Sequence, residues 1–326
     1  MIPQFTNSVF VIRPTNLDFN EETASDNILM KSPQKDPKNK GLSPKEIHEK
    51  NNDKGKRMHL SYILNLRSAG IQVIEFEQEN PIAYDSMWPD WFTTHRSENI
   101  PEGVFIVYPM RNPSRRLERN ENIIKKIKEL YNNCIDLSSL ENEQIFLEGK
   151  GAVIFDNANF KLYCNLSERS HLKGLMALKQ ELDKISKYPW TLINFQAFSL
   201  DSKLIYHTDC MFQILDKHAI VCLESLKEND RKMLIDELTN PSKNRTKTYE
   251  IIDISFHEML SMCSNVMNLK NSQNENVIAM SAKAFTNYSE KNVQILSKNY
   301  KLLITNINLL ENVGGGSARC LLAEKY

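Results

Sequence analysis

From Gly70 to the C-terminus, short apolar runs alternate with longer stretches in which apolar residues recur at helical spacing. The short runs predict β-strands, and the longer stretches predict amphipathic helices. This alternation is typical of mixed α/β architecture. No proline-rich or glycine-rich linker divides the chain into two halves. We therefore expect residues 1–326 to form a single α/β domain.

Most of the chain divides into expected strands and helices. Strands are predicted over residues 8–12, 71–76, 104–108, 144–147, 152–155, 161–166, 249–254, 277–280 and 301–307. Two further runs, 211–215 and 219–223, are expected to pair as a β-hairpin. Helices are predicted over residues 58–68, 121–131, 171–186, 230–238, 256–269 and 289–299. Periodicity alone does not define the order of the strands.

Residues 31–57 differ from the rest of the chain because lysine, asparagine, aspartate and proline dominate them. We expect a polar insertion that is exposed and partly mobile. Within it, Ser43-Pro44-Lys45-Glu46 has the signature of a helix start, with serine as N-cap and glutamate three residues later. A polar insertion in a surface loop costs little folding free energy. We favour that interpretation over a segment that docks a partner.

Charge and cysteine content argue against several classes of protein. Lysine plus arginine number 41 and aspartate plus glutamate number 41, so no net field attracts nucleic acid or an anionic membrane. No apolar run approaches the roughly 18 residues that span a bilayer, and the segment from Met1 to Phe5 lacks signal-peptide features. Six scattered cysteines without a CxxC pair favour a reducing compartment, the cytoplasm, and offer no zinc site.

Cys320 follows a glycine cluster near the C-terminus, Gly314-Gly315-Gly316. Glycine permits positive φ and lets a ligand approach the main chain closely. A cysteine beyond such a turn can lie at the mouth of a pocket, where its thiolate would be the reactive form. The alternative is a flexible turn followed by an inert core cysteine, because free cysteines are usually buried.

Among the histidines, His207 has the most informative setting, at the end of an apolar strand and two residues before Asp209. Histidine is the side chain best suited to move protons near neutral pH. Asp209 could orient this imidazole or bind a cationic substrate itself. The alternative is a structural histidine at a strand end.

Two further acidic segments are candidates for ligand binding. Glu148 lies between a predicted strand and Gly149, where backbone can crowd a ligand. Asp85 and Asp90 are interleaved with aromatic residues that include Trp88, a combination that suits a planar cation. The alternatives are a solvated turn carboxylate for Glu148 and a core-anchoring aromatic cluster for the second segment.

In chain order, these motifs resemble the guanidine-modifying, or pentein, superfamily. They are the aspartate-containing aromatic loop, Arg-Arg-x-Glu at 115–118, Leu-Glu-Gly at 147–149, His-Thr-Asp at 207–209 and Gly-Gly-Gly-Ser-x-x-Cys at 314–320. The chain is most similar to the amidinotransferase-like group that includes citrulline-utilization hydrolases, related to arginine deiminases and dimethylarginine dimethylaminohydrolases. The resemblance extends from about Phe10 to Tyr326 and implies a pentein α/β propeller of five ββαβ-type units with pseudo-fivefold symmetry.

The resemblance also implies roles for individual residues. It implies Cys320 as nucleophile, His207 as general acid and base, and Glu148 as supporting carboxylate. The substrate-binding residues that it implies are Asp85, Asp90, Asp209, Arg116 and Arg169, the two arginines holding an amino-acid carboxylate. No metal and no cofactor are expected.

Some positions depart from the family pattern. Gly149-Lys150-Gly151 stands where deiminases carry Gly-Gly-Asp. Asp90 and Asp209 stand where the most similar group is expected to carry amides. Added negative charge near the reacting carbon favours a guanidinium cation over a neutral ureido group.

The expected function is therefore that of a cysteine-dependent hydrolase in a single catalytic domain. It would act on the guanidino or ureido C–N bond of free arginine, citrulline or methylarginine through a covalent intermediate on Cys320. One alternative is an amidinotransferase that passes the amidino group to an amine, and another is a non-catalytic ligand-binding or partner-binding relative. The expected partner is a small-molecule amino-acid substrate; association as a homo-oligomer is left open.

Overall fold

This computed structural model describes residues 4–25 and 27–326. Every strand in these residues belongs to one of five three-stranded sheets, and all five sheets have the same strand order. In each sheet the middle strand pairs antiparallel with one neighbour and parallel with the other. The sheets are β15 (Ala323–Lys325), β1 (Ser8–Arg13), β2 (Gln72–Glu77); β3 (Phe92–His95), β4 (Val104–Val107), β5 (Asn133–Asp136); β6 (Val153–Asp156), β7 (Lys161–Asn165), β8 (Thr191–Phe195); β9 (Phe212–Ile214), β10 (His218–Val221), β11 (Glu250–Asp253); and β12 (Met267–Lys270), β13 (Asn276–Ser281), β14 (Lys301–Thr305). The chain is thus an α/β protein of small mixed sheets.

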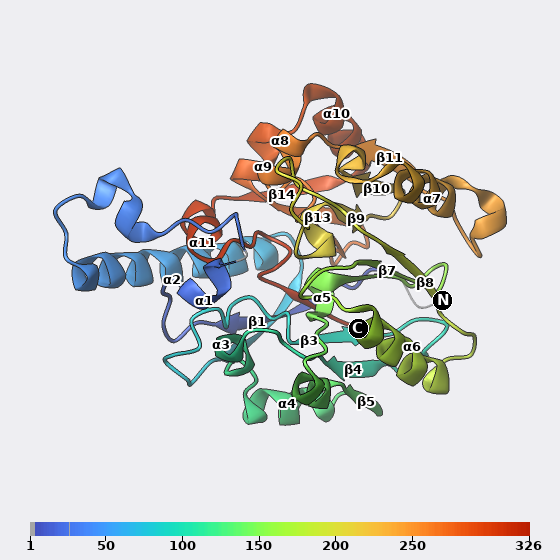
Figure 1. The fold of residues 1–326 in the computed structure, drawn as a ribbon, viewed down its shortest axis with the longest axis horizontal. Coiled ribbons are helices and arrows are strands. Elements are labelled where there is room, and N and C mark those ends of the chain that lie inside the picture. Colours follow the sequence, from blue (N-terminus) through green and yellow to red (C-terminus); the bar gives the residue numbers. More distant parts are fainter. Residues whose placement is uncertain (1–3, 26) are drawn as a thin grey trace.

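Helices join each middle strand to its parallel neighbour, because parallel strands require a crossover connection. The crossover helices are α2 (Pro44–Ser68), α4 (Glu121–Lys128), α6 (Leu172–Ile185), α7 (Glu228–Thr239), and α9 (Ala282–Asn287) with α10 (Glu290–Asn299). Figure 1 shows α2, α4, α6, α7 and α10 at the periphery, with the strands toward the middle. The strand from the C-terminus, β15, completes the sheet that β1 begins, so both ends of the chain contribute to one sheet.

Shorter helices lie in the remaining connections, both within and between these units. The α-helices are α1 (Glu21–Ala24), α3 (Pro113–Arg116), α5 (Gly149–Ala152), α8 (Phe256–Leu260) and α11 (Asn308–Gly314). The 3-10 helices are η1 (Pro33–Lys35), η2 (Pro37–Asn39), η3 (Ser138–Glu143), η4 (Thr208–Cys210), η5 (Leu223–Ser225) and η6 (Pro241–Lys243). In Figure 1, α5 lies near the centre of the molecule, between the labelled strands β3 and β7.

Continuous apolar sequence explains the buried middle strands. All four residues of β4 (Val-Phe-Ile-Val) are buried, and so are the apolar residues Leu162, Tyr163 and Cys164 in the middle of β7. A strand that is covered on both faces shows such an unbroken apolar run rather than alternation. The expected hairpin is confirmed as β9 paired with β10, with Ala219 opposite Ile214.

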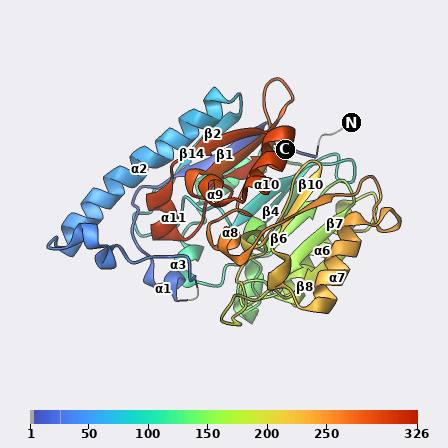
Figure 2. The same ribbon diagram turned by 90° about the horizontal axis from the view of Figure 1, so that it is seen from above.

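The helix start at Ser43 and the helix over 58–68 are both confirmed, but they belong to one continuous element. The two form one 25-residue helix, α2, whose Ser43 and Glu46 make a reciprocal capping box. Gly55 does not break it, since an isolated glycine inside a helix is tolerated. Figure 2 shows α2 as a long blue helix along one edge of the molecule. The partial mobility expected for residues 31–57 stays a prediction.

Two other predicted elements are wrong for local backbone reasons. The helix expected over 256–269 ends at Leu260, because Met262 adopts φ 69°, and β12 follows. The strand expected over 144–147 does not form: Gln144 has φ 55°, and Leu147 makes only an isolated bridge to Ser170. The short strands β3, β5, β8, β12 and β15 were not predicted.

Within the described residues, no helix is both long and apolar enough to cross a membrane. Residues 1–3, which belong to the segment used to argue against a signal peptide, lie outside the described residues.

Candidate active site

Three connections between units bring Cys320, His207 and Glu148 into one buried region. Glu148 directly precedes α5, His207 directly precedes η4, and Cys320 lies in the segment after α11. Gly315 ends α11 with φ 70°, which turns the chain toward Cys320. A Cβ atom on Gly151 would collide with the His207 ring, so glycine there lets α5 approach the imidazole.

Glu148 and His207 form a buried pair. His207 Nε2 lies 2.9 Å from Glu148 Oε2, and the other carboxylate oxygen accepts a hydrogen bond of 3.0 Å from the backbone N–H of Arg111. Burial would raise the pKa of Glu148, but the nearby Arg169 guanidinium and the hydrogen bond from His207 lower it to about 2. Glu148 therefore stays ionised near neutral pH and can hold the ring of His207 in one orientation.

The sulfur of Cys320 has two polar neighbours. The side-chain N–H of Asn265 donates to Sγ at 3.0 Å, and the thiol donates to Asp209 Oδ2 at 3.4 Å. Asn265 Oδ1 also accepts from the backbone N–H groups of Ser317 and Cys320, at 3.2 and 3.3 Å. Burial raises the pKa of Cys320, Asp209 and Asp90 raise it further, and Lys150 lowers it. The resting sulfur is thus a thiol held in place by Asn265.

Asp209 has one carboxylate oxygen without a hydrogen-bond partner among the described residues, Oδ1. Its other oxygen, Oδ2, lies beside the Cys320 sulfur and 3.6 Å from Arg319 Nε. Burial raises the pKa of Asp209, while His207 and Arg319 lower it. An N–H group of a planar cation would satisfy Oδ1 next to the sulfur.

Asp90 and Asp85 are both buried but already have partners. Lys150 Nζ lies 2.8 Å from Asp90 Oδ1, and Arg115 Nη1 lies 3.1 Å from Asp90 Oδ2. Burial would raise the pKa of Asp90, but Lys150 and Arg115 bring it well below its usual value. Asp85 Oδ2 accepts from Asn20 at 2.7 Å and from the Thr23 hydroxyl at 2.8 Å.

The aromatic residues near these carboxylates belong to the core. Trp88 packs in the same hydrophobic cluster as Cys320, and Trp91 and Phe92 pack in another cluster with strands β1 and β4. The core-anchoring interpretation therefore describes the packing of these rings.

Of the two predicted arginines, Arg169 lies beside Glu148, and the predicted substrate role of Arg116 stays a prediction. Arg169 is 1% exposed, and its Nη1 lies 3.5 Å from Glu148 Oε2; its guanidinium also stacks on the Tyr206 ring, 4.9 Å from the centroid. Arg116 instead lies 3.3 Å from Glu141 and donates to the Met110 carbonyl.

The sequence led to no site role for three residues of this region: Arg115, Lys150 and Asn265. Arg115 lies next to Arg116, and its guanidinium makes two hydrogen bonds to Glu118, at 2.6 and 3.1 Å. Lys150 was visible as a departure from the family pattern. Asn265 gave no signal, because it lies in a loop between α8 and β12 without a motif.

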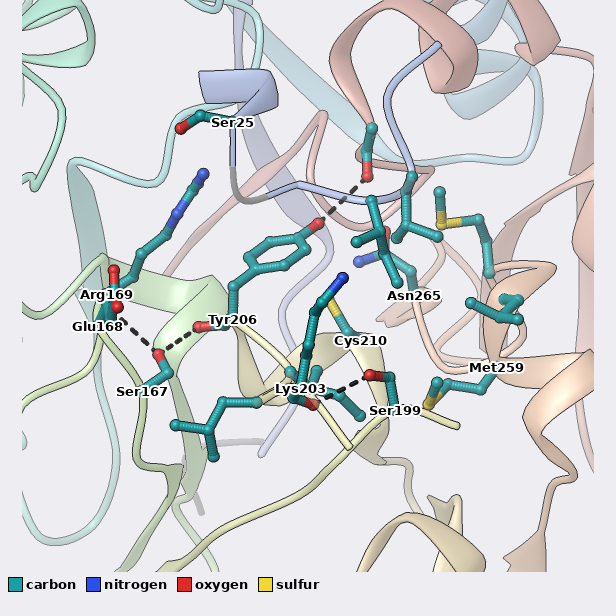
Figure 3. Close-up of a pocket in the computed structure, with 17 residues that line it drawn as sticks. Ser25, Ser167, Glu168, Arg169, Ser199, Lys203, Tyr206, Cys210, Met259 and Asn265 are labelled. Carbon is teal, nitrogen blue, oxygen red and sulfur yellow. Dashed lines mark hydrogen bonds between the residues drawn. The ribbon is translucent and has the colours of Figure 1, made fainter. Parts of the chain in front are cut away.

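A cavity of about 420 Å³ opens beside the buried residues. Arg169, Tyr206, Asn265 and Gly315 line it and also border the site, and most of the remaining lining is apolar. Figure 3 shows the Tyr206 side chain in this pocket with Arg169 and Asn265 on either side, and the Tyr206 hydroxyl donates to the Gly315 carbonyl at 3.3 Å. The described residues contain no group of three or more His, Cys, Asp or Glu placed to hold a metal ion.

Comparison with solved structures identifies proteins of similar fold. The chain is 15% identical, with a TM-score of 0.70, to the N-terminal domain of ArgZ bound to product, an arginine dihydrolase from the ornithine-ammonia cycle in cyanobacteria; the match covers 97% of this chain and 96% of that one. For apo ArgZ the identity is 15% and the TM-score 0.68, and the match covers 97% of this chain but only 40% of that one. An adduct of dimethylarginine dimethylaminohydrolase with S-methyl-L-thiocitrulline matches at 14% identity and a TM-score of 0.63, over 98% of this chain and 100% of that one.

At these identities the likeness concerns the fold. The chain spans 40% of the length of full-length ArgZ. No curated protein sequence matches the chain. A family profile described as N,N dimethylarginine dimethylhydrolase, eukaryotic, matches residues 13–326. The chain therefore belongs to the N,N dimethylarginine dimethylhydrolase family.

Proposed function

We propose that the protein hydrolyses the guanidino or ureido C–N bond of a free arginine-related amino acid, such as arginine, citrulline or methylarginine, through a covalent intermediate on Cys320. The observation that carries this proposal is the position of the Cys320 sulfur. It lies 3.4 Å from Asp209 Oδ2, while Asp209 Oδ1 has no partner among the described residues. A guanidinium nitrogen bound to Oδ1 would bring its central carbon close to the sulfur.

The first half of the reaction forms the covalent intermediate. The Cys320 thiol gives up its proton to His207, and the sulfur adds to the central carbon to form a tetrahedral centre. His207 then returns the proton to the departing nitrogen, which leaves as ammonia or a methylamine. The C–N bond breaks and a thiouronium, or a thiocarbamate from a ureido group, remains on Cys320. Glu148 supports the positive charge on His207 during these steps, at 2.9 Å.

The second half releases the product. His207 takes a proton from water, and the water oxygen adds to the carbon that is bound to sulfur. The C–S bond then breaks, and the proton returns from His207 to Cys320. Asn265 donates to the sulfur at 3.0 Å and so stabilises it as both nucleophile and leaving group.

A positively charged substrate would favour ionisation of the Cys320 thiol. Asp209 and Asp90 oppose ionisation of Cys320, and a cation bound at Asp209 would offset that effect. Arg169 borders the 420 Å³ cavity and would bind the amino-acid carboxylate of a substrate that enters there. The corresponding roles of Arg116 and Asp85 stay predictions.

We further propose a single catalytic domain over residues 1–326, in which 31–57 is an insertion and five ββαβ-type units surround a central channel with pseudo-fivefold symmetry. The repeated strand order of the five sheets supports this arrangement. The cysteines, none of them in a disulfide, support a cytoplasmic location.

A substrate panel tests the proposal. The purified protein is incubated with arginine, citrulline, agmatine and dimethylarginine, and release of ammonia, methylamine or dimethylamine is measured together with product masses. We expect turnover of at least one free amino acid and poorer turnover of agmatine, which has no carboxylate. The Cys320→Ser protein, compared by thermal unfolding to establish that it is folded, is the control. Adding glycine to the arginine reaction detects an amidinotransferase by a new product.

A further inference from the structure

Lys150 is a buried cation that takes no part in the proposed reaction steps. Its side chain is 2% exposed, and its position follows Gly149 in α5. The ammonium lies 2.8 Å from Asp90 Oδ1 and donates to the backbone carbonyl of Cys320 at 3.1 Å. Lysine is almost never fully buried unless it is paired. Here its partners are a predicted substrate carboxylate and the main chain of the predicted nucleophile.

This arrangement makes Asp90 and Asp209 unequal. Lys150 and Arg115 occupy one oxygen each of Asp90. Asp209, by contrast, keeps Oδ1 without a partner in the described part of the chain. Each oxygen of Asp90 already has a cationic partner, so a substrate nitrogen would gain less there than at Asp209 Oδ1, where it would satisfy a buried acceptor that has no other partner in the described residues.

We propose that Lys150 is a positioning residue that holds Asp90 away from the substrate and fixes the Cys320 main chain, so that Asp209 receives the guanidinium nitrogen. The inference deepens the proposed function and rests on it. Lys150 also offsets one of the negative charges that face the sulfur. Arg319 strengthens the link between the two segments, since its guanidinium donates to the Lys150 carbonyl at 3.2 Å.

Alkylation of Cys320 as a function of pH measures this electrostatic role without any substrate. The charged and titratable groups around the sulfur are Asp90, Lys150, His207, Asp209, Arg319, Tyr62 and Tyr206. The rate of iodoacetamide labelling is followed by mass spectrometry of the peptide that contains Cys320. Peptide analysis distinguishes Cys320 from Cys134, which is exposed, and from Cys210, which is partly exposed.

The variants form a double-mutant cycle: Lys150→Met, Asp90→Asn and the combination of both. Removing Lys150 alone should move the alkylation profile to higher pH, and Asp90→Asn should move it to lower pH. The double variant should lie between them and near the wild type. For the substrate found in the panel, Lys150→Met should lower kcat/KM about tenfold or more, and the double variant should recover part of that loss.

Lys161→Met is the matched control. Lys161 is also a buried lysine, and it pairs with Glu237 at 2.8 Å in a different part of the fold. It should lose stability in thermal unfolding without moving the Cys320 profile. If Lys150→Met does not fold, the double variant still tests the inference, because it removes both charges and should keep a profile near the wild type.

Two results would overturn the inference. One is a pH profile of Cys320 alkylation in Lys150→Met that coincides with that of the wild type. If Lys150→Met does not fold, the equivalent result is an alkylation profile of the double variant that lies far from that of the wild type. The other is a double variant whose kcat/KM is lower than that of Lys150→Met, because Asp90 would then contact the substrate itself. Failure of the proposed function is distinguishable, since a protein that turns over no guanidino compound still yields the alkylation profiles.

Discussion

The carboxylate of Asp209 contacts the Cys320 sulfur through only one of its two oxygens. Its Oδ2 is 3.4 Å from Sγ, and its Oδ1 has no partner among the described residues. A buried acceptor without a partner costs free energy unless a ligand or water satisfies it. This relationship connects the charge of the substrate to the protonation state of the nucleophile.

Asp209→Asn should therefore have two opposite effects. Turnover of arginine should fall by roughly 10- to 100-fold, because a charged hydrogen bond worth about 1.5–3 kcal/mol is lost. Alkylation of Cys320 should become faster at a given pH, because Asp209 raises the pKa of the thiol. Steady-state kinetics and peptide mass spectrometry measure the two effects. Asp53→Asn, at an exposed pair with Arg57, is the control. Slower alkylation together with unchanged turnover would contradict this role of Asp209.

Asn265→Ala should slow both turnover and alkylation of Cys320, by about tenfold, because the N–H group that stabilises the thiolate is lost. Asn265→Asp, which keeps the shape but adds a negative charge, should slow alkylation further. The exposed Asn122→Ala is the control. An Asn265→Asp protein that alkylates as fast as the wild type would show that the amide N–H does not act on the sulfur.

Glu148 should make stability depend on pH in acid. Its pKa is about 2 in the folded protein, below the ordinary value of 4.5. A carboxyl with a depressed folded pKa contributes stability that is present above pH 4.5 and is lost as pH falls toward 2. The contribution near neutral pH is on the order of 3 kcal/mol. Urea unfolding at pH 7, 4.5 and 3 should show that the difference between wild type and Glu148→Gln shrinks as pH falls. A constant difference would mean that Glu148 is not held ionised in the fold.

Ser43→Ala should destabilise α2 without changing the chemistry. The capping box between Ser43 and Glu46 satisfies backbone N–H groups at the helix start, and losing the cap costs about 1 kcal/mol. Urea unfolding measures the loss, and the rate of Cys320 alkylation should stay that of the wild type. A large change in that rate would indicate that residues 31–57 act on the site.

Sequence motifs identified several residues of the site, but they did not identify the residues that contact them. Glu148 and His207 come together as a pair at 2.9 Å, and both adjoin motifs that the sequence displays. Lys150 was noticed as a departure from the family, but its contact with Asp90 depends on packing between two separate units. Asn265 reaches the sulfur from a loop without a motif, so only the tertiary structure reveals it.

In the fold too, features that depend on local sequence were predicted, and features that depend on pairing with distant strands were not. Unbroken apolar runs identified the middle strands β4 and β10, which are buried on both faces. The edge strands β5 and β8 were missed because they mix polar and apolar residues and depend on pairing with a distant strand. Met262 and Gln144, both at positive φ, end elements that periodicity would continue.

The most direct test of the central claim is to trap the covalent intermediate. The protein is incubated with its best substrate from the panel and quenched in acid during turnover, and the peptide that contains Cys320 is analysed by mass spectrometry. We predict an adduct on Cys320 with the mass of the substrate less the departing ammonia or amine, which forms at least as fast as turnover and is absent from Cys320→Ser, which should be inactive. Turnover by Cys320→Ser, or an adduct on another cysteine with Cys320 unmodified, would contradict the proposed mechanism.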